Sequence, residues 1–279
     1  MRLNSYNFFF AIIIFAFIFI IAFKILNREK VNAENNLDIN KVKKVIDFYN
    51  SVLNSEKKIY SQNGEDGILE KLIDFIKINK TGGYYVEFGT QNGRECNTRY
   101  LREKFGWNGL LMDGSNENPS INLHRESILH SNILSLLEKY KVPNDIDILS
   151  EDTDYADYHI VEEMLKKYHP KILVHEVNQQ PGNMCVTVPK ENKLIFWDGS
   201  NYHGGSVCAF WCLAKRFSYT MVYCDKAGVN CFWLRNDLVE KYLNIEPKVV
   251  QSLLNPIFLY KKPGFVYPST NKKWVDVSC

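Results

Sequence analysis

The 279-residue chain lacks the features that mark several specialised classes of protein. Its 34 basic residues nearly balance its 32 acidic residues, and a net charge of +2 provides no basic field that would attract nucleic acid. Outside the first 30 or so residues, repeats and low-complexity segments are absent. With 46% hydrophobic and 24% charged residues, the composition is that of an ordinary globular protein. We therefore expect a folded domain with no nucleic-acid partner.

Cysteine is neither abundant nor arranged in a recognisable framework. The seven cysteines are an odd number, and no Cys-x-x-Cys motif or pair of closely spaced histidines accompanies them. Cys208 and Cys212 share a helix face, where buried thiols explain them better than zinc ligands. The sequence thus predicts no metal site. In an oxidising compartment one or two disulfides become possible, but their pairing cannot be read from the sequence.

A long apolar run stands at the amino terminus. Residues 8–23 are uninterrupted by polar side chains, and with Lys24 snorkelling the run approaches the ~20 residues that cross a bilayer. We expect residues 1–27 to be a transmembrane signal anchor. A cleaved signal peptide is the alternative, because Val31-Asn32-Ala33 resembles a cleavage site and Arg2 gives a basic start. Basic residues are commoner after the span than before it, which by itself favours a cytoplasmic domain.

The rest of the chain divides by composition and periodicity into three segments. Residues 28–57 read as a polar stalk followed by a linker helix at residues 46–53. Residues 58–240 form one α/β domain, and residues 241–279 a carboxyl-terminal extension that packs on it. About 240 residues after the leader suit one such domain with a large core.

Apolar strand patterns alternate with helical patterns through this domain, which predicts a mostly parallel sheet with helices on both faces. The predicted strands are 84–88, 109–112, 146–150, 172–175, 194–197, 219–223 and 229–234. Only Cys224 to Gly228 separate the last two, so these should form an antiparallel hairpin.

The strongest local motif is Val86-Glu87-Phe88-Gly89-Thr90-Gln91-Asn92-Gly93, at the end of the first predicted strand. Sheets of this type bind ligands in the crevice at their carboxyl edge. Gly89 allows a tight turn and a close approach of the backbone to a ligand. Glu87 would face that ligand, and its carboxylate suits an amino group rather than a phosphate. The spacing is not Gly-x-Gly-x-x-Gly, so a nicotinamide dinucleotide, and with it an oxidoreductase, is disfavoured.

A second acid ends the next predicted strand, in Leu110-Leu111-Met112-Asp113. Nucleotide-binding sheets place a carboxylate at this point to bind ribose hydroxyls. Asp113 therefore indicates a nucleoside ligand, and a turn-forming Asp before Gly114 is the alternative.

The segment Tyr60-Ser61-Gln62-Asn63-Gly64-Glu65-Asp66-Gly67 precedes a helical apolar pattern. Asn63 can cap that helix, and Glu65 and Asp66 suit the positive end of its dipole. This reading leaves Ser61 and Gln62 unexplained.

Together these motifs, with Asp198-Gly199-Ser200-Asn201-Tyr202 and Tyr223-Cys224 near the end, resemble the FkbM-type methyltransferase domain, and more narrowly its animal, Star-like, often membrane-anchored branch. The resemblance covers roughly residues 58–238. It implies a Rossmann-like, seven-stranded methyltransferase fold ending in an antiparallel hairpin, S-adenosylmethionine as cofactor, and methyl transfer to a hydroxyl of a carbohydrate or small molecule. It also implies a luminal domain in the endomembrane system (ER or Golgi), or a secreted one if the leader is cleaved. The cofactor-binding residues it implies are Gln62, Glu87, Gly89, Gln91, Gly93, Asp113 and Asp152.

The fourth strand departs from the family pattern, which has two acids around one apolar residue and then commonly a glycine. Asp152 and Asp154 match the acids, but Glu151 and Thr153 replace apolar residues, and Tyr155 stands where the glycine would be. A carboxylate buried without a partner is costly or becomes protonated. Either Glu151 lies past the buried end of the strand, or this copy is under relaxed constraint, and Tyr155 would crowd the ligand loop.

Methyl transfer to oxygen needs in-line positioning and at most one general base. Asp154 is the first candidate for that base and Glu176 the second, with His203 in a loop that could meet an acceptor. The same residues also allow a non-catalytic membrane protein that keeps the fold as a trafficking or binding module.

Overall fold

The computed structural model describes residues 39–191, 193 and 196–279. Residues 42–279 form one compact unit. No helix within the described ranges combines the length and the apolar character needed to cross a bilayer. The expected anchor at residues 1–27 lies outside these ranges.

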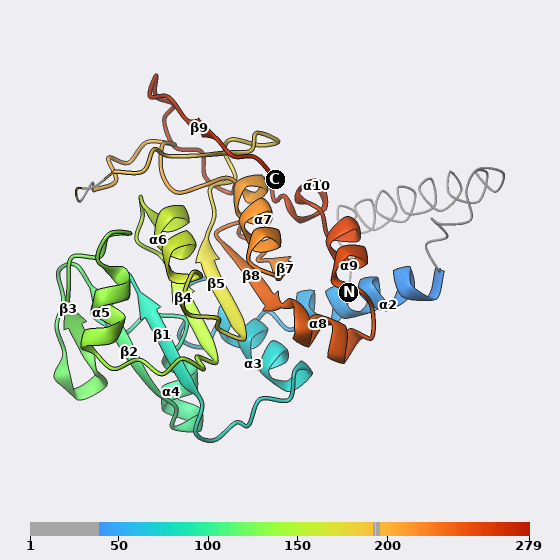
Figure 1. Ribbon diagram of the computed structural model, residues 1–279, viewed down its shortest axis with the longest axis horizontal. Coiled ribbons are helices and arrows are strands. Elements are labelled where there is room, and N and C mark those ends of the chain that lie inside the picture. Colours follow the sequence, from blue (N-terminus) through green and yellow to red (C-terminus); the bar gives the residue numbers. More distant parts are fainter. Residues whose placement is uncertain (1–38, 192, 194–195) are drawn as a thin grey trace, which may run out of the picture. The chain divides into compact units, whose positions relative to one another are not determined.

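A seven-stranded sheet forms the centre of this unit (Figure 1). Its strands lie in the order β3-β2-β1-β4-β5-β8-β7. They are β1 (Tyr84–Phe88), β2 (Asn108–Asp113), β3 (Leu123–Arg125), β4 (Ile148–Glu151), β5 (Ile172–Glu176), β7 (Tyr219–Cys224) and β8 (Asn230–Arg235). The first five are parallel, whereas β8 runs antiparallel to both β5 and β7.

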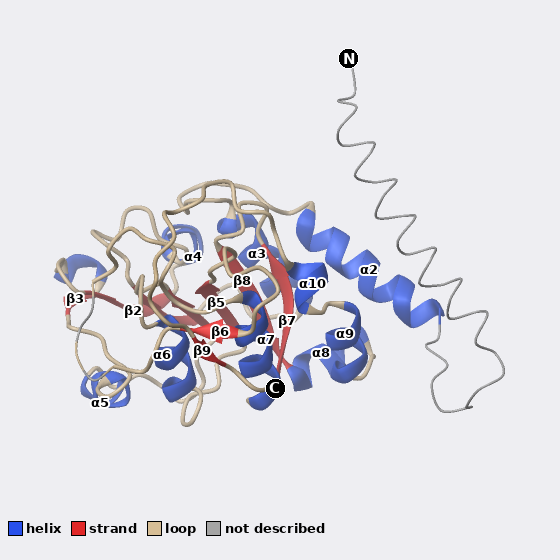
Figure 2. Cartoon of the chain, turned by 90° about the horizontal axis from the view of Figure 1, so that it is seen from above, coloured by secondary structure: helices blue, strands red, loops and turns tan. Residues whose placement is uncertain are grey.

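Helices cover both faces of the sheet, and its central strands are therefore buried on both sides. Figure 2 shows α3 (Glu65–Phe75) and α4 (Arg99–Phe105) on one face. On the other face lie α5 (Ile133–Lys139), α6 (Asp157–Met164) and α7 (Val207–Arg216). Three further helices follow β8: α8 (Asn236–Leu243), α9 (Pro247–Leu253) and α10 (Pro256–Leu259).

The antiparallel hairpin of β7 and β8 confirms the predicted ending of the sheet. Asp225 closes the turn, since its carboxylate accepts the backbone N–H groups of Val229 and Asn230. Parallel strands in the order 3-2-1-4-5, completed by this hairpin, form the Rossmann-like methyltransferase fold. The predicted fold class is therefore confirmed for the described part of the chain.

The structure differs from the sequence prediction at two elements, the linker helix and the strand expected at residues 194–197. The linker helix begins at Ile39 rather than residue 46, giving α2 (Ile39–Leu53). It is no isolated linker, because Val45, Phe48, Tyr49 and Val52 are buried in the core. Lysines at positions 41, 43 and 44 mask the apolar period of its first turns.

In the predicted strand at residues 194–197, the described residues Phe196 and Trp197 lie outside any strand. Residues 194 and 195 are outside the described ranges. The seventh strand is instead β3, whose three residues at a sheet edge are too few to show a period.

A long insertion after β5 and the carboxyl-terminal tail lie across the carboxyl ends of β4 and β5 (Figure 1). They pair as β6 (Val186–Thr187) and β9 (Val275–Asp276). Disulfides Cys185–Cys208 and Cys212–Cys279 join the insertion, α7 and the tail. The prediction that Cys208 and Cys212 are buried thiols is therefore wrong, because their partners come from distant parts of the sequence.

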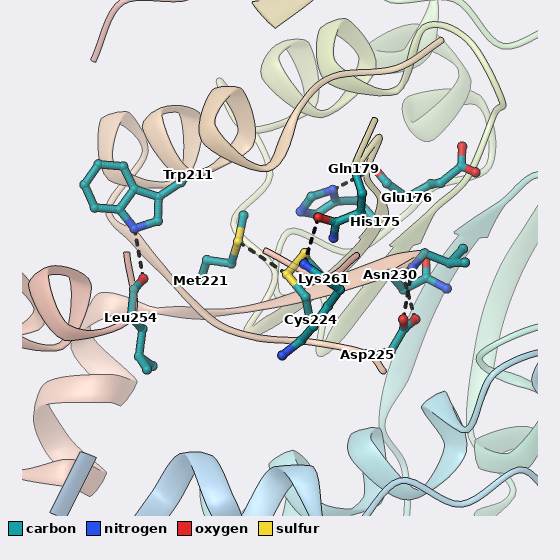
Figure 3. Close-up of a disulfide and its surroundings, with 12 residues drawn as sticks. His175, Glu176, Gln179, Trp211, Met221, Cys224, Asp225, Asn230, Leu254 and Lys261 are labelled. Atoms are coloured by element: carbon teal, nitrogen blue, oxygen red, sulfur yellow. Dashed lines mark hydrogen bonds between the residues drawn. A yellow bond between two sulfur atoms is a disulfide. The ribbon is translucent and has the colours of Figure 1, made fainter. Parts of the chain in front are cut away.

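A third disulfide, Cys224–Cys231, closes the β7–β8 hairpin (Figure 3). Cys96 is free and buried.

Candidate functional site

The order of the strands reverses at β1, whose neighbours are β2 and β4. Ligands of open α/β sheets bind in the crevice at such a reversal, outside the carboxyl ends of the strands. Gly89 follows β1 here with φ +68°, and a Cβ on it would lie 1.5 Å from the carbonyl oxygen of Asp152. Glycine is thus required by the adjacent β4 loop as well as by the left-handed turn. Gly93 also has positive φ, and its Cβ would meet Ile121.

Glu87 is buried and does not face the crevice, so the expectation that it faces a ligand is wrong. Its Oε1 accepts the N–H of Asn97 at 2.7 Å. Its Oε2 accepts the N–H of Thr98 at 2.9 Å and the Thr98 hydroxyl at 2.5 Å. Burial raises the pKa of Glu87, and these donors oppose the rise. Glu87 thereby supplies acceptors to the start of α4, where backbone N–H groups have no partner within the helix.

Asp113 at the end of β2 joins two loops. Oδ1 accepts the N–H groups of Ser115 and Asn116 and the Asn116 side-chain amide. Oδ2 accepts only the N–H of Gln91, at 2.8 Å. Asp113 thus forms the turn that was the alternative reading. Oδ2 still has acceptor capacity toward the Gly89 loop, where Gln91 is exposed with φ +47°.

The segment before α3 is explained by Asp66, one of whose carboxylate oxygens accepts several hydrogen bonds from it. Asp66 Oδ2 accepts the N–H groups of Ile59, Tyr60 and Ser61 and the Ser61 hydroxyl. Asp66 and Ser61 thus fix this loop, which accounts for Ser61. Gln62 points outward and is exposed.

The prediction that Asn63 caps α3 is wrong. The N-cap is Gly64, with φ +104° and no side-chain cap, because the turn requires a left-handed residue there. The Asn63 N–H instead donates to Glu65 Oε2 at 2.7 Å.

At the carboxyl end of β4 the buried acids are not fully hydrogen-bonded, and Glu151 is the first of them. Glu151 is within the strand and 0% exposed, so it does not lie past the buried end. Its Oε1 accepts the Thr153 hydroxyl at 2.8 Å, while Oε2 has no hydrogen-bond partner among the described residues. Burial, together with the Asp157 carboxylate, raises the pKa of Glu151 well above its usual range.

Three further carboxylates gather beside it. One oxygen each of Asp152, Asp157 and Glu176 lie within 4.8 Å of one another. Asp157 begins α6 and is 0% exposed; Oδ1 accepts the Thr153 N–H at 2.7 Å, and Oδ2 has no partner in the described part of the chain. Burial raises the pKa values of Asp152, Asp157 and Glu176, and the mutual repulsion of these acids adds to the rise for Asp152 and Glu176.

His203 is the basic group nearest to this cluster. Its Nδ1 lies 3.7 Å from Glu176 Oε2, and the side chain is buried. Burial lowers the pKa of His203, against the attraction of Asp157 and Asp154. Among the described lysines and arginines, none forms an ion pair with the acids of the cluster.

A cavity of about 90 Å³ opens beside Glu176 and His203. The end of β5, the β7–β8 turn and the tail segment 263–267 line it. Tyr267 from the tail packs against Trp197, with ring centroids 4.6 Å apart, and Trp197 against His203. The tail therefore provides an aromatic wall next to the acidic cluster.

Asp154 is exposed at the mouth of this region, with φ +67°. Tyr155 does not crowd the Gly89 loop: its buried ring packs with Val188 and Tyr202 from the insertion. The tyrosine thus anchors the insertion that covers β4 and β5.

The structure brings Asp152 and Glu176 together and places Asp154 near them, whereas Glu87 and Gln62 lie elsewhere. Asp157 was missed, because an acid in the first turn of a helix is explained by the helix dipole alone. His203 was noted only as a loop residue. The aromatic wall had no local signal, since Trp197 and Tyr267 are 70 residues apart (267 − 197) in the sequence.

No protein-family model matches the chain, and no curated protein matches its sequence. Solved structures with some similarity include the CMeT domain of the citrinin polyketide synthase, which is 12% identical with a TM-score of 0.33 and matches 61% of this chain. The match covers 50% of the length of that domain's chain.

In two other solved structures the match covers most of the other chain. A SAM-dependent methyltransferase from Aquifex aeolicus is 13% identical with a TM-score of 0.34, over 71% of this chain and 99% of that one. An O-methyltransferase of a trans-AT PKS multienzyme from Brevibacillus brevis, in complex with S-adenosyl-L-homocysteine, is 7% identical with a TM-score of 0.35, over 72% and 89%. Similarities of this size are too low to indicate a function. The fold class follows from the order and direction of the strands.

Proposed function

We propose that the protein is an S-adenosylmethionine-dependent O-methyltransferase of the FkbM type, acting on a hydroxyl of a carbohydrate or small molecule. One observation carries the proposal: the Gly89 turn and Asp113 meet at the reversal of strand order, in a sheet that ends in the antiparallel β7–β8 hairpin. An acid beside a glycine turn at this point suits a nucleoside ligand.

The residues present fit this cofactor in part. Asp113 Oδ2 accepts a single hydrogen bond and can accept another from a ribose hydroxyl. Gly89, Gln91 and Gly93 form a loop whose backbone a ligand can approach closely. Glu87 does not fit as an acceptor for the amino group, because both its oxygens bind the start of α4.

When bound, S-adenosylmethionine would supply an electrophilic methyl group. The chain's own part is to orient the acceptor hydroxyl and to receive its proton. Asp154 is exposed at the mouth of the acidic region and is the proposed proton acceptor. Glu176, partly exposed beside His203, is placed to contact the acceptor.

The aromatic wall supports a carbohydrate as acceptor. Tyr267 lines the cavity together with Glu176, Trp197 packs against Tyr267, and both rings are half-buried. Aromatic faces pack against the apolar face of a sugar ring, and carboxylates accept hydrogen bonds from its hydroxyls.

Calorimetry with S-adenosylmethionine and S-adenosylhomocysteine on the full chain tests the cofactor. We expect binding to the wild type and at least tenfold weaker binding to Asp113→Ala, with Gly114→Ala as the matched control. Absence of binding by folded protein overturns the proposal.

A non-catalytic module with the same fold is the second candidate. It is favoured by Glu151, a buried acid with an unpartnered oxygen in the strand that departs from the family pattern. Transfer of labelled methyl groups to a glycan panel separates the two. Turnover that falls at least 100-fold in Asp154→Asn, with cofactor affinity unchanged, supports the enzyme; cofactor binding without turnover on any acceptor supports the module.

We also propose that the domain folds in an oxidising compartment, behind an anchor formed by residues 1–27. The three disulfides support this, since such bonds persist mainly in secreted and luminal proteins. Asn79 of the Asn-Lys-Thr sequon is exposed in a turn, with Oδ1 accepting from Thr81.

Membrane extraction and glycosidase treatment test this placement. We expect the cellular protein to remain with membranes after alkaline wash and to shift in mass on deglycosylation, with Asn79→Gln abolishing the shift. Six cysteines resistant to alkylation before reduction are expected as well. Free thiols at all seven positions in cellular protein would contradict the proposal.

A further inference from the structure

The cluster of Asp152, Asp157 and Glu176 holds more negative charge than its surroundings neutralise. The fully buried Asp157 has one oxygen, Oδ2, without a hydrogen-bond donor in the described part of the chain, and so has Glu176 Oε2. The hydroxyl of Thr153, shared between Glu151 and Asp157, and its N–H are the donors that the local loop supplies. Buried acceptors of this kind are normally satisfied, and each one left bare needs a partner.

A protein cation is not that partner. The lysines and arginines of the described segments that form ion pairs do so with other acids, and His203 is held toward its neutral form by burial. The cluster therefore requires protons or a bound cation.

We propose that Asp152, Asp157 and Glu176 bind one hard divalent cation. Carboxylate oxygens are the ligands that Ca²⁺, Mn²⁺ and Mg²⁺ prefer, and the three acids come from two strand ends and a helix start, which form a rigid frame. Oxygens on opposite sides of Ca²⁺ are separated by about 4.6–5.2 Å, twice the metal–oxygen distance. The three carboxylate oxygens lie within 4.8 Å of one another, so they can contact one such cation together.

The position gives the cation a role. It would lie at the ends of β4 and β5, beside the cavity and the aromatic wall. There it can bind two neighbouring hydroxyls of the acceptor and lower the pKa of the one to be methylated. This role rests on the proposed methyl transfer, but the cation site itself does not.

Mn²⁺ is the probe, because its paramagnetic signal reports binding directly. The full chain, stripped with a chelator and without S-adenosylmethionine, is titrated at neutral pH. We expect one Mn²⁺ per chain, displaced by an excess of Ca²⁺, and a rise in melting temperature on binding.

Asp157→Asn and Glu176→Gln should each weaken Mn²⁺ binding at least tenfold. Glu163→Gln is the matched control on the same helix as Asp157, because Glu163 pairs with Lys166 at the surface, and it should leave binding unchanged. Two variants are used so that misfolding of one, checked by its melting curve, does not remove the test.

Absence of Mn²⁺ binding by the folded wild type overturns the proposal, and means that protons neutralise the cluster. Equal binding by the wild type and both variants overturns it as well, because the ligands are then elsewhere. The test is independent of the proposed function: calorimetry with S-adenosylmethionine on metal-free protein can fail while Mn²⁺ binds, and the reverse.

Discussion

Two groups of carboxylates occupy the same edge of the sheet and differ in how they are satisfied. Glu87 at the end of β1 and Asp113 at the end of β2 each accept backbone N–H groups on both carboxylate oxygens. Asp157 and Glu176, at the β4 and β5 side, each keep an oxygen without a donor. Glu87 and Asp113 thus hold together the segments that follow β1 and β2, whereas Asp157 and Glu176 each keep an acceptor that no donor meets.

This difference locates binding capacity better than the motifs do. A carboxylate with donors on both oxygens contributes to stability, and in this group Asp113 Oδ2, with a single donor, keeps capacity for a ligand. An unsaturated one is costly until something binds it. We therefore expect substitution of Glu87 to change mainly the free energy of unfolding, and substitutions in the second group to change mainly ligand binding.

The largest loss of stability is expected at the contact between Gly89, after β1, and the backbone of Asp152, after β4. In Gly89→Ala the new Cβ meets the Asp152 carbonyl oxygen and the residue is strained at φ +68°. We expect the free energy of unfolding to fall by about 3 kcal/mol or more. Thermal and urea unfolding measure it, with Gly114→Ala as control, since nothing lies within 4 Å of a Cβ there. A Gly89→Ala variant as stable as the control would show that the two loops are not in contact.

A matched pair of substitutions addresses the comparison directly. The Glu87 carboxylate accepts three hydrogen bonds from Asn97 and Thr98 at the start of α4. In Glu87→Gln one of these acceptor oxygens becomes an NH₂ group, which cannot accept a hydrogen bond. We expect a loss of about 1–3 kcal/mol. Glu151→Gln removes a charge that burial already disfavours and should change stability by less than about 1 kcal/mol. Urea unfolding at neutral pH checks both, and equal losses would contradict the division into two groups.

Asp225 sharpens the comparison, because it accepts backbone N–H groups and is still protonated easily. Burial raises its pKa from 3.8 to about 7, with Glu65 adding to the rise against those hydrogen bonds. A raised acid pKa means that the folded state binds the proton more tightly. The stabilisation is complete below the unfolded pKa and is lost as the pH rises toward about 7.

Between these limits the contribution of Asp225 to the free energy of unfolding should fall by about 1.4 kcal/mol per pH unit. The difference between wild type and Asp225→Asn, measured by urea unfolding across this range, should show that slope. Gly114→Ala, which removes no titratable group, should show no such slope against wild type. A difference that stays constant with pH would mean that the Asp225 hydrogen bonds keep it ionised.

The smallest effect on stability is expected at Gln62, which is exposed. Gln62→Ala should change the free energy of unfolding by less than about 0.5 kcal/mol. If Gln62 contacts the cofactor, as the resemblance implies, affinity for S-adenosylmethionine falls about threefold to tenfold, the effect of one hydrogen bond. Unchanged affinity by calorimetry would remove Gln62 from the proposed site.

Much of the fold could be predicted from local patterns. The buried runs of β1, β2, β4 and β5 and the hairpin spacing are written into consecutive residues, so their existence and order were predicted with bounds off by at most two residues. The β3 strand and the start of α2 could not be predicted, because an edge strand of three residues and a helix with clustered lysines show no clear period.

The site was predictable only in part, and for a physical reason. The sequence by itself determined that Gly89 and Asp113 stand at strand ends, since strand patterns and glycine turns are local. Which acids are saturated was decided by tertiary structure, because the donors for Glu87 come from the next helix and the neighbours of Asp157 come from β4 and β5. The disulfide partners and the aromatic wall were decided in the same way: long-range contacts bring Cys212 to Cys279 and Trp197 to Tyr267, and no spacing along the chain encodes them.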